Sequence, residues 1–248
     1  MRLRGDLRQS VATGLFTVLI VGLLLALSGC GGTTTTTMPI PNVTVDPADF
    51  SATIDSKYLP LRPGMQFTYE GTSESDATRV EVSVSKETKE IMGVTCLVVS
   101  DTVFVNGQLE EATLDWYAQD RTGNVWYFGE DSKEYKNGKV VSTKGSWEAG
   151  VDGAQPGIIM EADPKVGDSY RQEYLQGEAE DMAQVLALDL TRNVYGRTYS
   201  QLLQTREWTP LEPGVAEEKL YAPGVGLVET KMVEGGSDAE YLVQVIGG

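Results

Sequence analysis

Apolar and polar positions alternate along much of the chain after about residue 58. Between Arg79 and Ser85, valines occupy positions 80, 82 and 84, and polar residues occupy the positions between them. Successive side chains of a strand point to opposite faces, so this segment predicts a strand with one buried face. Asn-Gly pairs at 106–107 and 137–138 separate neighbouring runs, and Asn-Gly favours the two-residue type I′ turn. The pattern therefore predicts two antiparallel hairpins.

The same pattern of apolar runs separated by turn residues continues to the C-terminus and predicts about ten strands. A helical period finds little support there, and residues 178–190, which fit either a helix or a buried strand, are interpreted as a strand. An all-β body of this size must curl or close to protect its edges. We expect one all-β domain at 56–248, a large curved antiparallel sheet forming an open half barrel, with a β-sandwich as the alternative.

The N-terminus has the layout of an export signal. Three arginines at positions 2, 4 and 8 precede an almost wholly apolar run from 11 to 27. About 17 residues is also the lower limit for spanning a bilayer, so a retained helical anchor is the rival interpretation. Leu27-Ser28-Gly29-Cys30 resembles the lipobox of bacterial lipoproteins, in which the cysteine thiol receives a diacylglycerol before cleavage. This resemblance implies a signal peptide at 1–29 and lipidation of Cys30.

The segment 30–55 is expected to be a tether between the lipid anchor and the domain, because it opens with glycines, a threonine run and two prolines and has no periodicity. Residues 1–29 carry three arginines and one aspartate, so the net charge of -16 becomes -18 in the mature chain. An acidic body is repelled by anionic headgroups, so the lipid itself should hold the protein to a membrane. The expected location is the extracytoplasmic cell envelope, with the leaflet left open.

Composition removes several classes of function. The chain has no histidine, which excludes Ser-His-Asp triads, Cys-His pairs and imidazole metal sites. A pI near 4.4 argues against nucleic-acid binding. Cys96 lies in an apolar run and is interpreted as a small buried hydrophobe, not a reactive thiol. The acidic loops lack the spacing of a calcium loop. We therefore expect no cofactor and no metal, and we expect that the protein is not an enzyme.

One hairpin can be followed residue by residue. If 120–124 is its loop, Tyr117 opposes Tyr127 and Trp116 opposes Phe128. One face then collects Leu114, Trp116, Ala118, Trp126 and Phe128, and the other collects Asp115, Tyr117, Gln119, Val125 and Tyr127. Continuing the pairing through the turn at 106–107 adds Leu97 and Val99 to the first face, and Cys96 and Val98 to the second. Both faces are substantially apolar.

Two interpretations of the second face compete. It is either core that a neighbouring segment covers, or the wall of a concavity that holds an apolar or amphiphilic ligand. In the second case the candidate ligand-lining residues are Asp115, Tyr117, Gln119 and Tyr127.

Three stretches, 115–120, 123–130 and 221–228, resemble segments of uncharacterised bacterial envelope lipoproteins. Those families are similar to the lipoprotein-carrier fold, a curved antiparallel sheet that forms an unclosed barrel. The resemblance covers most of 58–245, and it implies lipid handling by analogy only, since fold does not fix function. It brings no catalytic residue, and the lid helix of the carriers has no counterpart here.

The first functional hypothesis is therefore a membrane-anchored extracytoplasmic lipoprotein that binds an apolar or amphiphilic ligand in a curved sheet. The alternative is a structural lipoprotein, or one whose partner is another envelope protein, without a small-molecule ligand. A carboxylate hydrolase that works without histidine is the third, and no acidic pair can be nominated for it.

Overall fold

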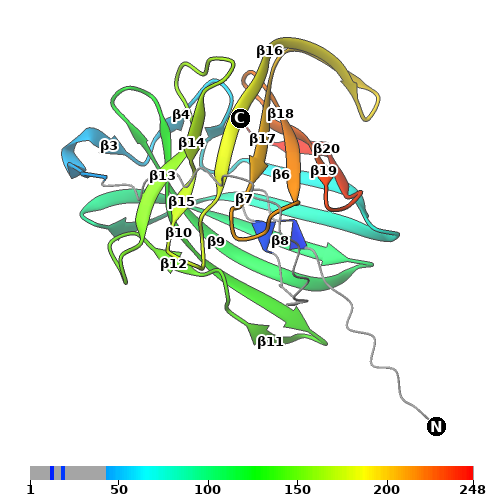
Figure 1. The fold of residues 1–248 in the computed structure, drawn as a ribbon, viewed down its shortest axis with the longest axis horizontal. Helices are drawn as coiled ribbons and strands as arrows, with labels where there is room; N and C mark the ends of the chain where they lie inside the picture. Colours follow the sequence, from blue (N-terminus) through cyan, green and yellow to red (C-terminus); the bar gives the residue numbers. More distant parts are fainter. Residues whose placement is uncertain (1–11, 14–17, 20–42, 248) are drawn as a thin grey trace, which may run out of the picture.

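The computed structural model describes residues 12–13, 18–19 and 43–247, and it is all-β (Figure 1). Apart from a single 3₁₀ turn, η1 (Pro47–Asp49), no helix occurs among these residues. The predicted fold class, a large antiparallel sheet, is confirmed, and residues 178–190 contribute to a strand as expected. Cys30 and the lipobox lie outside the described residues. No helix in the described part of the chain is long and apolar enough to cross a membrane.

The strands are short near the N-terminus and long in the barrel. In order they are β1 (Ala12–Thr13), β2 (Val18–Leu19), β3 (Phe50–Ser51), β4 (Ile54–Asp55), β5 (Pro60–Leu61), β6 (Gln66–Ser73), β7 (Asp76–Ile91), β8 (Val94–Val105), β9 (Gln108–Asp120), β10 (Val125–Lys136), β11 (Lys139–Ser142), β12 (Trp147–Glu148), β13 (Gln155–Met160), β14 (Ser169–Arg171), β15 (Glu173–Tyr174), β16 (Met182–Val194), β17 (Arg197–Trp208), β18 (Ala216–Ala222), β19 (Gly226–Glu234) and β20 (Ala239–Ile246).

Thirteen strands follow one another around the sheet, from β14 through β16–β20 and β6–β10 to β13 and β15. The two ends of this path, β14 and β15, are neighbours in sequence, and only Gln172 separates them. One stretch of chain therefore pairs with β16 on one side and with β13 on the other, so the sheet nearly closes. The sequence predicts about ten strands, and the path around the sheet contains thirteen. The difference arises because the region at 155–174 contains Gly and Pro, so its short strands have the sequence pattern of loops.

Both predicted Asn-Gly turns are confirmed. Asn106 and Gly107 have φ of 50° and 75°, and Asn137 and Gly138 have φ of 54° and 71°. Two consecutive positive φ values define the type I′ turn, whose twist matches that of the flanking strands. The loop at 120–124 also gives the predicted pairing of Tyr117 with Tyr127.

Two β-bulges change the predicted register. One lies at 128–129, so that Glu130 pairs with Asp115 and the predicted pairing of Trp116 with Phe128 is wrong. The other shifts the β8–β9 pairing next to Val103, so that Leu97 pairs with Tyr117 and Val98 with Trp116. A one-residue shift exchanges the two faces of a strand. The predicted placing of Leu97 and Val99 with Trp116, and of Cys96 and Val98 with Tyr117, is therefore reversed.

The outward face of this hairpin is covered by the segment that precedes the barrel. Phe50 of β3 makes edge-to-face contacts with Trp126 and Phe128, at ring-centroid distances of 5.9 and 5.4 Å. Arg121 pairs with Asp49 at 2.9 Å. Residues 43–55, which the sequence analysis assigns to the tether, thus contact the sheet before residue 56 is reached. Leu114, on the same outward face, lies beyond this cover and is 41% exposed.

The β16–β17 hairpin extends as an arm beyond its neighbours (Figure 1). β17 pairs with β18 only from Leu203 to Glu207, so its first half has no partner on that side. The β16–β17 pairing is irregular between 185 and 192, and Asp189 and Gln201 adopt positive φ of 58° and 56°. Bulges and left-handed residues bend a strand pair. The bend carries the arm's turn, with Tyr195 at its tip, onto β20, where Tyr195 stacks on Tyr241 at 6.0 Å.

Candidate functional site

Three of the four predicted ligand-lining residues lie together inside the barrel. Tyr117 and Tyr127 are fully buried and stack at a centroid distance of 4.9 Å and an interplanar angle of 19°. The Tyr127 hydroxyl donates a hydrogen bond to Oδ1 of Asp115 at 2.6 Å. Gln119, the fourth residue, accepts from the Asp55 backbone and donates to the Asp55 carboxylate. The structure brings Asp115, Tyr117 and Tyr127 into one packed cluster and places Gln119 at the segment that covers the barrel.

The inward face of the barrel is unusually acidic. In the described part of the chain, buried carboxyl side chains at inward-facing strand positions, as their register with buried neighbours indicates, include Asp101, Glu111, Asp115, Glu130, Glu207, Glu217 and Glu240. Among the described residues, Lys219 is the one buried base. Burying a charge is costly unless it is paired or neutralised. The interior must therefore be stabilised by ion pairing, hydrogen bonding and protonation.

Lys219 is the centre of a satisfied ionic network on one wall. Its Nζ lies 2.8 Å from Oε2 of Glu207 and 2.8 Å from Oε1 of Glu217. Glu207 also accepts from Thr205 at 2.8 Å and from Tyr221 at 3.2 Å. Burial lowers the pKa of Lys219, but the two carboxylates outweigh burial and raise this pKa above its ordinary value. This wall carries a fixed ion triad.

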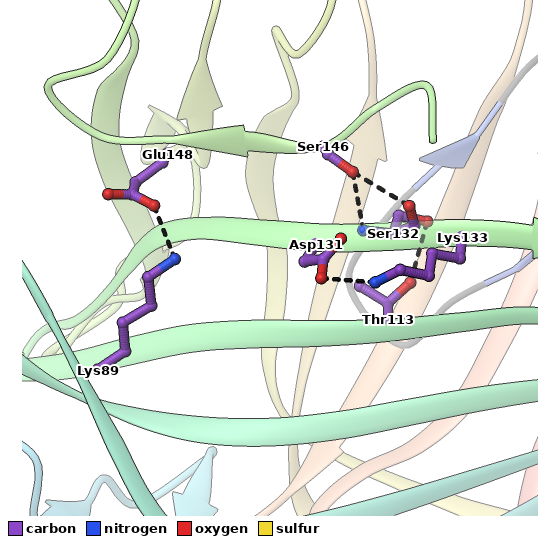
Figure 2. Close-up of polar contacts among 7 residues, drawn as sticks. All are labelled: Lys89, Thr113, Asp131, Ser132, Lys133, Ser146 and Glu148. Atoms are coloured by element: carbon purple, nitrogen blue, oxygen red, sulfur yellow. Dashed lines mark hydrogen bonds and ion pairs between the residues drawn. The ribbon is translucent and has the colours of Figure 1, made fainter. Parts of the chain in front are cut away.

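The opposite wall is held by neutral hydrogen bonds. The Thr113 hydroxyl donates to Oε1 of Glu111 at 3.1 Å and shares a second hydrogen bond, also of 3.1 Å, with the Ser132 hydroxyl. The Ser146 hydroxyl accepts from the backbone N–H of Ser132 and donates to its carbonyl oxygen (Figure 2). Burial, reinforced by Asp101, raises the pKa of Glu111 to about 8. Burial likewise raises the pKa of Asp115, although the Tyr127 hydroxyl opposes this. The carboxyl of Glu111 is therefore favoured in its protonated form near neutral pH.

Outside the barrel, ion pairs lie at the strand surface. Lys89 pairs with Glu148 at 2.7 Å, and Lys133 with Asp131 at 2.6 Å (Figure 2). The Lys89 ammonium also sits 3.3 Å from the centroid of the Trp116 ring. Such half-exposed pairs contribute little stability individually. Lys89 also covers the Trp116 ring, which is on the outward face of the sheet.

A groove of about 690 Å³ lies on the outward face of β6 and β7, under the tip of the arm. Its lining is drawn from four separate parts of the chain: Glu70, Gly71, Thr72, Ala77, Thr78, Arg79, Glu81, Phe104, Gly107, Tyr195, Ala239 and Tyr241. This volume falls in the range of small-molecule sites, roughly 300–1,000 Å³. Because Tyr241, Glu70, Arg79 and Phe104 are consecutive cross-strand partners, they form one row along the groove.

Small side chains create the hollow. Gly71, Ala77 and Ala239 line it, and a Cβ added to Gly71 would lie 1.9 Å from the carbonyl oxygen of Ala239. Glycine at position 71 therefore permits the close approach of β6 and β20. Aromatic rings stand around this floor, with Phe104 from β8, Tyr241 from β20 and the 63% exposed Tyr195 from the arm. The walls of the groove are therefore aromatic rings, and its floor is largely backbone.

The polar side of the groove is an ion-paired cluster. Arg79 contacts Glu70 at 3.2 Å and Glu81 at 2.8 Å, and all three side chains are about half exposed. Hydrogen bonding to Glu81 raises the pKa of Arg79, so the guanidinium stays charged. An apolar wall beside a charged cluster is the arrangement that accommodates an amphiphile, with its apolar part on the rings and its polar end at the cluster.

Sequence reasoning missed this groove. Its residues appear in the sequence as ordinary solvent-facing positions of half-buried strands, and Tyr195 appears as a turn residue. Only the bend of the arm and the small residues at 71, 77 and 239 bring them together. A signal was nevertheless present in the small residues at 71, 77 and 239, at strand positions that β-branched side chains often occupy.

Two expectations about reactive groups can be compared with the structure. Cys96 is fully buried, and burial raises the pKa of its thiol to about 12, which confirms its interpretation as a core residue. Within residues 43–247, no group of three or more acidic or cysteine side chains is arranged to hold a metal ion.

No family model matches the chain, and no curated protein matches it. Among solved structures, it is similar to a candidate exported protein with a YmcC-like fold from Bacteroides fragilis NCTC 9343, with 14% identity and a TM-score of 0.46 over 77% of this chain and 100% of that one. It is also similar to a candidate lipoprotein from Parabacteroides distasonis ATCC 8503, with 9% identity and a TM-score of 0.42 over 77% of this chain and 99% of that one. At these scores neither likeness assigns a family or a function.

Proposed function

We propose that this chain is an extracytoplasmic lipoprotein, anchored through a diacylglycerol on Cys30, that binds a small amphiphilic molecule in the groove beneath the β16–β17 arm. The anchoring is supported by the sequence order of basic start, apolar run and Leu-Ser-Gly-Cys. The binding is supported by the groove's volume and by its lining. The proposal is for a binding protein and includes no catalytic step.

The observation that carries the binding proposal is the juxtaposition of three aromatic rings with a charged cluster over a floor of small residues. Isolated exposed aromatic residues are common on protein surfaces and need no explanation. Here Phe104 and Tyr241 from two strands and Tyr195 from the turn of the arm surround one hollow. An amphiphile in it would remove apolar surface from water, which stabilises a complex by about 25 cal/mol per Å² before the costs of association.

The groove is a different place from the one the sequence indicated. The rings of Tyr117 and Tyr127 already pack on each other, and Asp115 is engaged by Tyr127. None of these residues lines the groove. A ligand-lining role for Asp115, Tyr117, Gln119 and Tyr127 stays a prediction, whereas the proposed ligand site is lined by side chains that remain accessible.

The proposal is tested by filling the groove. Ala77→Phe places a ring on an exposed strand position of the floor and leaves the buried face unchanged. Val141→Phe adds the same ring at an exposed position of β11, outside the groove, and is the matched control. The full chain in lipid nanodiscs is titrated with dansyl-labelled undecanoic acid, using empty nanodiscs to measure partition of the probe into lipid.

We expect saturable binding to the wild type and to Val141→Phe, and a loss of about tenfold or more in affinity for Ala77→Phe, with unchanged thermal midpoints. Equal affinity of all three proteins would place the probe elsewhere. Absence of saturable binding by the wild type would favour the alternative, an envelope lipoprotein that acts through a protein partner.

A further inference from the structure

A second pocket, of about 490 Å³, lies on the outward face of β14, β16 and β17, where the loop from Thr209 to Val215 folds over the sheet. Its floor consists of two cross-strand rows. Arg171, Met182 and Trp208 are consecutive partners in one row, and Gln184 and Arg206 are partners in the next. Pro210, Pro213 and Val215 of the loop form the cover. This pocket shares no lining residue with the groove under the arm.

Arg171 is the unusual residue of this pocket. Its Nη1 is buried and has no hydrogen-bond partner, and among the described residues Arg171 forms no ion pair. Its guanidinium lies 4.9 Å from the ring centroid of Tyr174, a cation–π contact that uses the face of the group. In a chain with 36 acidic residues and 20 basic ones, a buried guanidinium nitrogen without a carboxylate is unexpected. A buried donor that is left without a partner costs stability, which a ligand acceptor would recover.

Three of the other four charged side chains of the pocket are already engaged. Nη2 of Arg206 pairs with Glu234 at 2.8 Å. Glu180 accepts a hydrogen bond from the backbone of Gly177 at 2.9 Å. Burial raises the pKa of Glu212 above its ordinary value, although Lys144 opposes this shift. The neutral form of the Glu212 carboxyl is therefore more favoured than that of a fully solvated glutamate. Arg171 is therefore the group that offers unused hydrogen-bonding capacity to a ligand.

We propose that this pocket binds a small carboxylate that carries an apolar body. The carboxylate accepts hydrogen bonds from Arg171, whose planar guanidinium matches a carboxylate with two parallel donors. The apolar body packs between Trp208 and Met182 below and Pro210 and Pro213 above. The inference is independent of the groove beneath the arm, because the two sites share no lining residue and the tests use different variants.

The test uses 3-phenylpropionate and its uncharged analogue 3-phenylpropanamide, which have the same apolar body. Each is titrated by calorimetry into the full-length chain in nonionic detergent. Inorganic phosphate is titrated as an anion without an apolar body. Arg171→Gln removes the charge and the forked donor, and Arg192→Gln, at an exposed position of β16 outside the pocket, is the control.

We expect the carboxylate to bind at least about tenfold more tightly than the amide and more tightly than phosphate, a preference of the size of a charge-assisted hydrogen bond. Arg171→Gln should remove that preference and Arg192→Gln should retain it. Equal binding of carboxylate and amide, or phosphate binding as tight as that of the carboxylate, would overturn the proposal. The comparison of three ligands on the wild type decides the question even where Arg171→Gln fails to fold.

Discussion

Glu111 provides the sharpest test of the acidic barrel interior. Its carboxyl is buried on β9, accepts from Thr113, and faces Asp101 from β8 and Glu134 and Ser132 from β10. Its pKa is raised from 4.5 to about 8, so the folded state holds a proton that the unfolded state releases near pH 4.5. Stability from this group is therefore complete below about pH 4.5 and is lost as pH rises to about 8.

The magnitude follows from the size of the shift. A shift of one pKa unit corresponds to 1.36 kcal/mol, so the loss between pH 4.5 and 8 is on the order of 5 kcal/mol at most. Glu111→Gln keeps the shape and the acceptor for Thr113 but cannot ionise. The variant should match the wild type within about 1 kcal/mol at pH 5 and exceed its free energy of unfolding by several kcal/mol at pH 9.

Urea unfolding at pH 5, 7 and 9 measures this difference directly. Glu87→Gln, at an exposed position of β7, is the control and should leave the pH dependence unchanged. A Glu111→Gln variant whose stability differs from the wild type by the same amount at pH 5 and pH 9 would refute the reasoning, because protonation would then play no part.

Three further predictions concern single side chains. Tyr127→Phe removes the donor to Asp115 and should lower the free energy of unfolding by about 1–3 kcal/mol, measured by thermal denaturation; an unchanged midpoint would mean that this bond contributes nothing net. Lys219→Met leaves Glu207 and Glu217 without their cation and should cost on the order of 3–5 kcal/mol at pH 7. The cost should be smaller at pH 5, because burial already raises the pKa of Glu217 and favours its neutral form, and a loss independent of pH would contradict the ion triad. Cys30→Ser should abolish incorporation of radiolabelled fatty acid and leave a larger precursor, whereas equal labelling of variant and wild type would exclude Cys30 as the lipidation site.

The strands and tight turns could be predicted from the sequence because both depend on local residues. Alternation at 79–85 and the Asn-Gly pairs at 106–107 and 137–138 specify strands and type I′ turns without reference to distant parts of the chain. The bulges could not be predicted in this way. An extra residue such as Gly129 becomes visible only when both strands are paired, yet it decides which side chains enter the barrel.

The acidic interior was missed for a related reason. Glu111, Thr113 and Asp115 alternate with less polar residues, and this pattern ordinarily marks a solvent-exposed face. In this protein the polar side faces inward, where Thr113, Ser132 and Tyr127 supply hydrogen bonds and protonation removes charge. This polar face lies inside because the sheet curves and nearly closes. No local sequence pattern predicts that closure.

The most direct test of the central claim is photo-crosslinking of an amphiphile to the full chain. A diazirine-bearing fatty acid is irradiated with the nanodisc-embedded protein, with and without excess unlabelled fatty acid, and the modified residues are identified by mass spectrometry. The account predicts competed labelling at 70–81, 104–107, 195 and 239–241, the residues around the groove. Labelling that is not competed, or competed labelling concentrated at 115–127 inside the barrel, would contradict it.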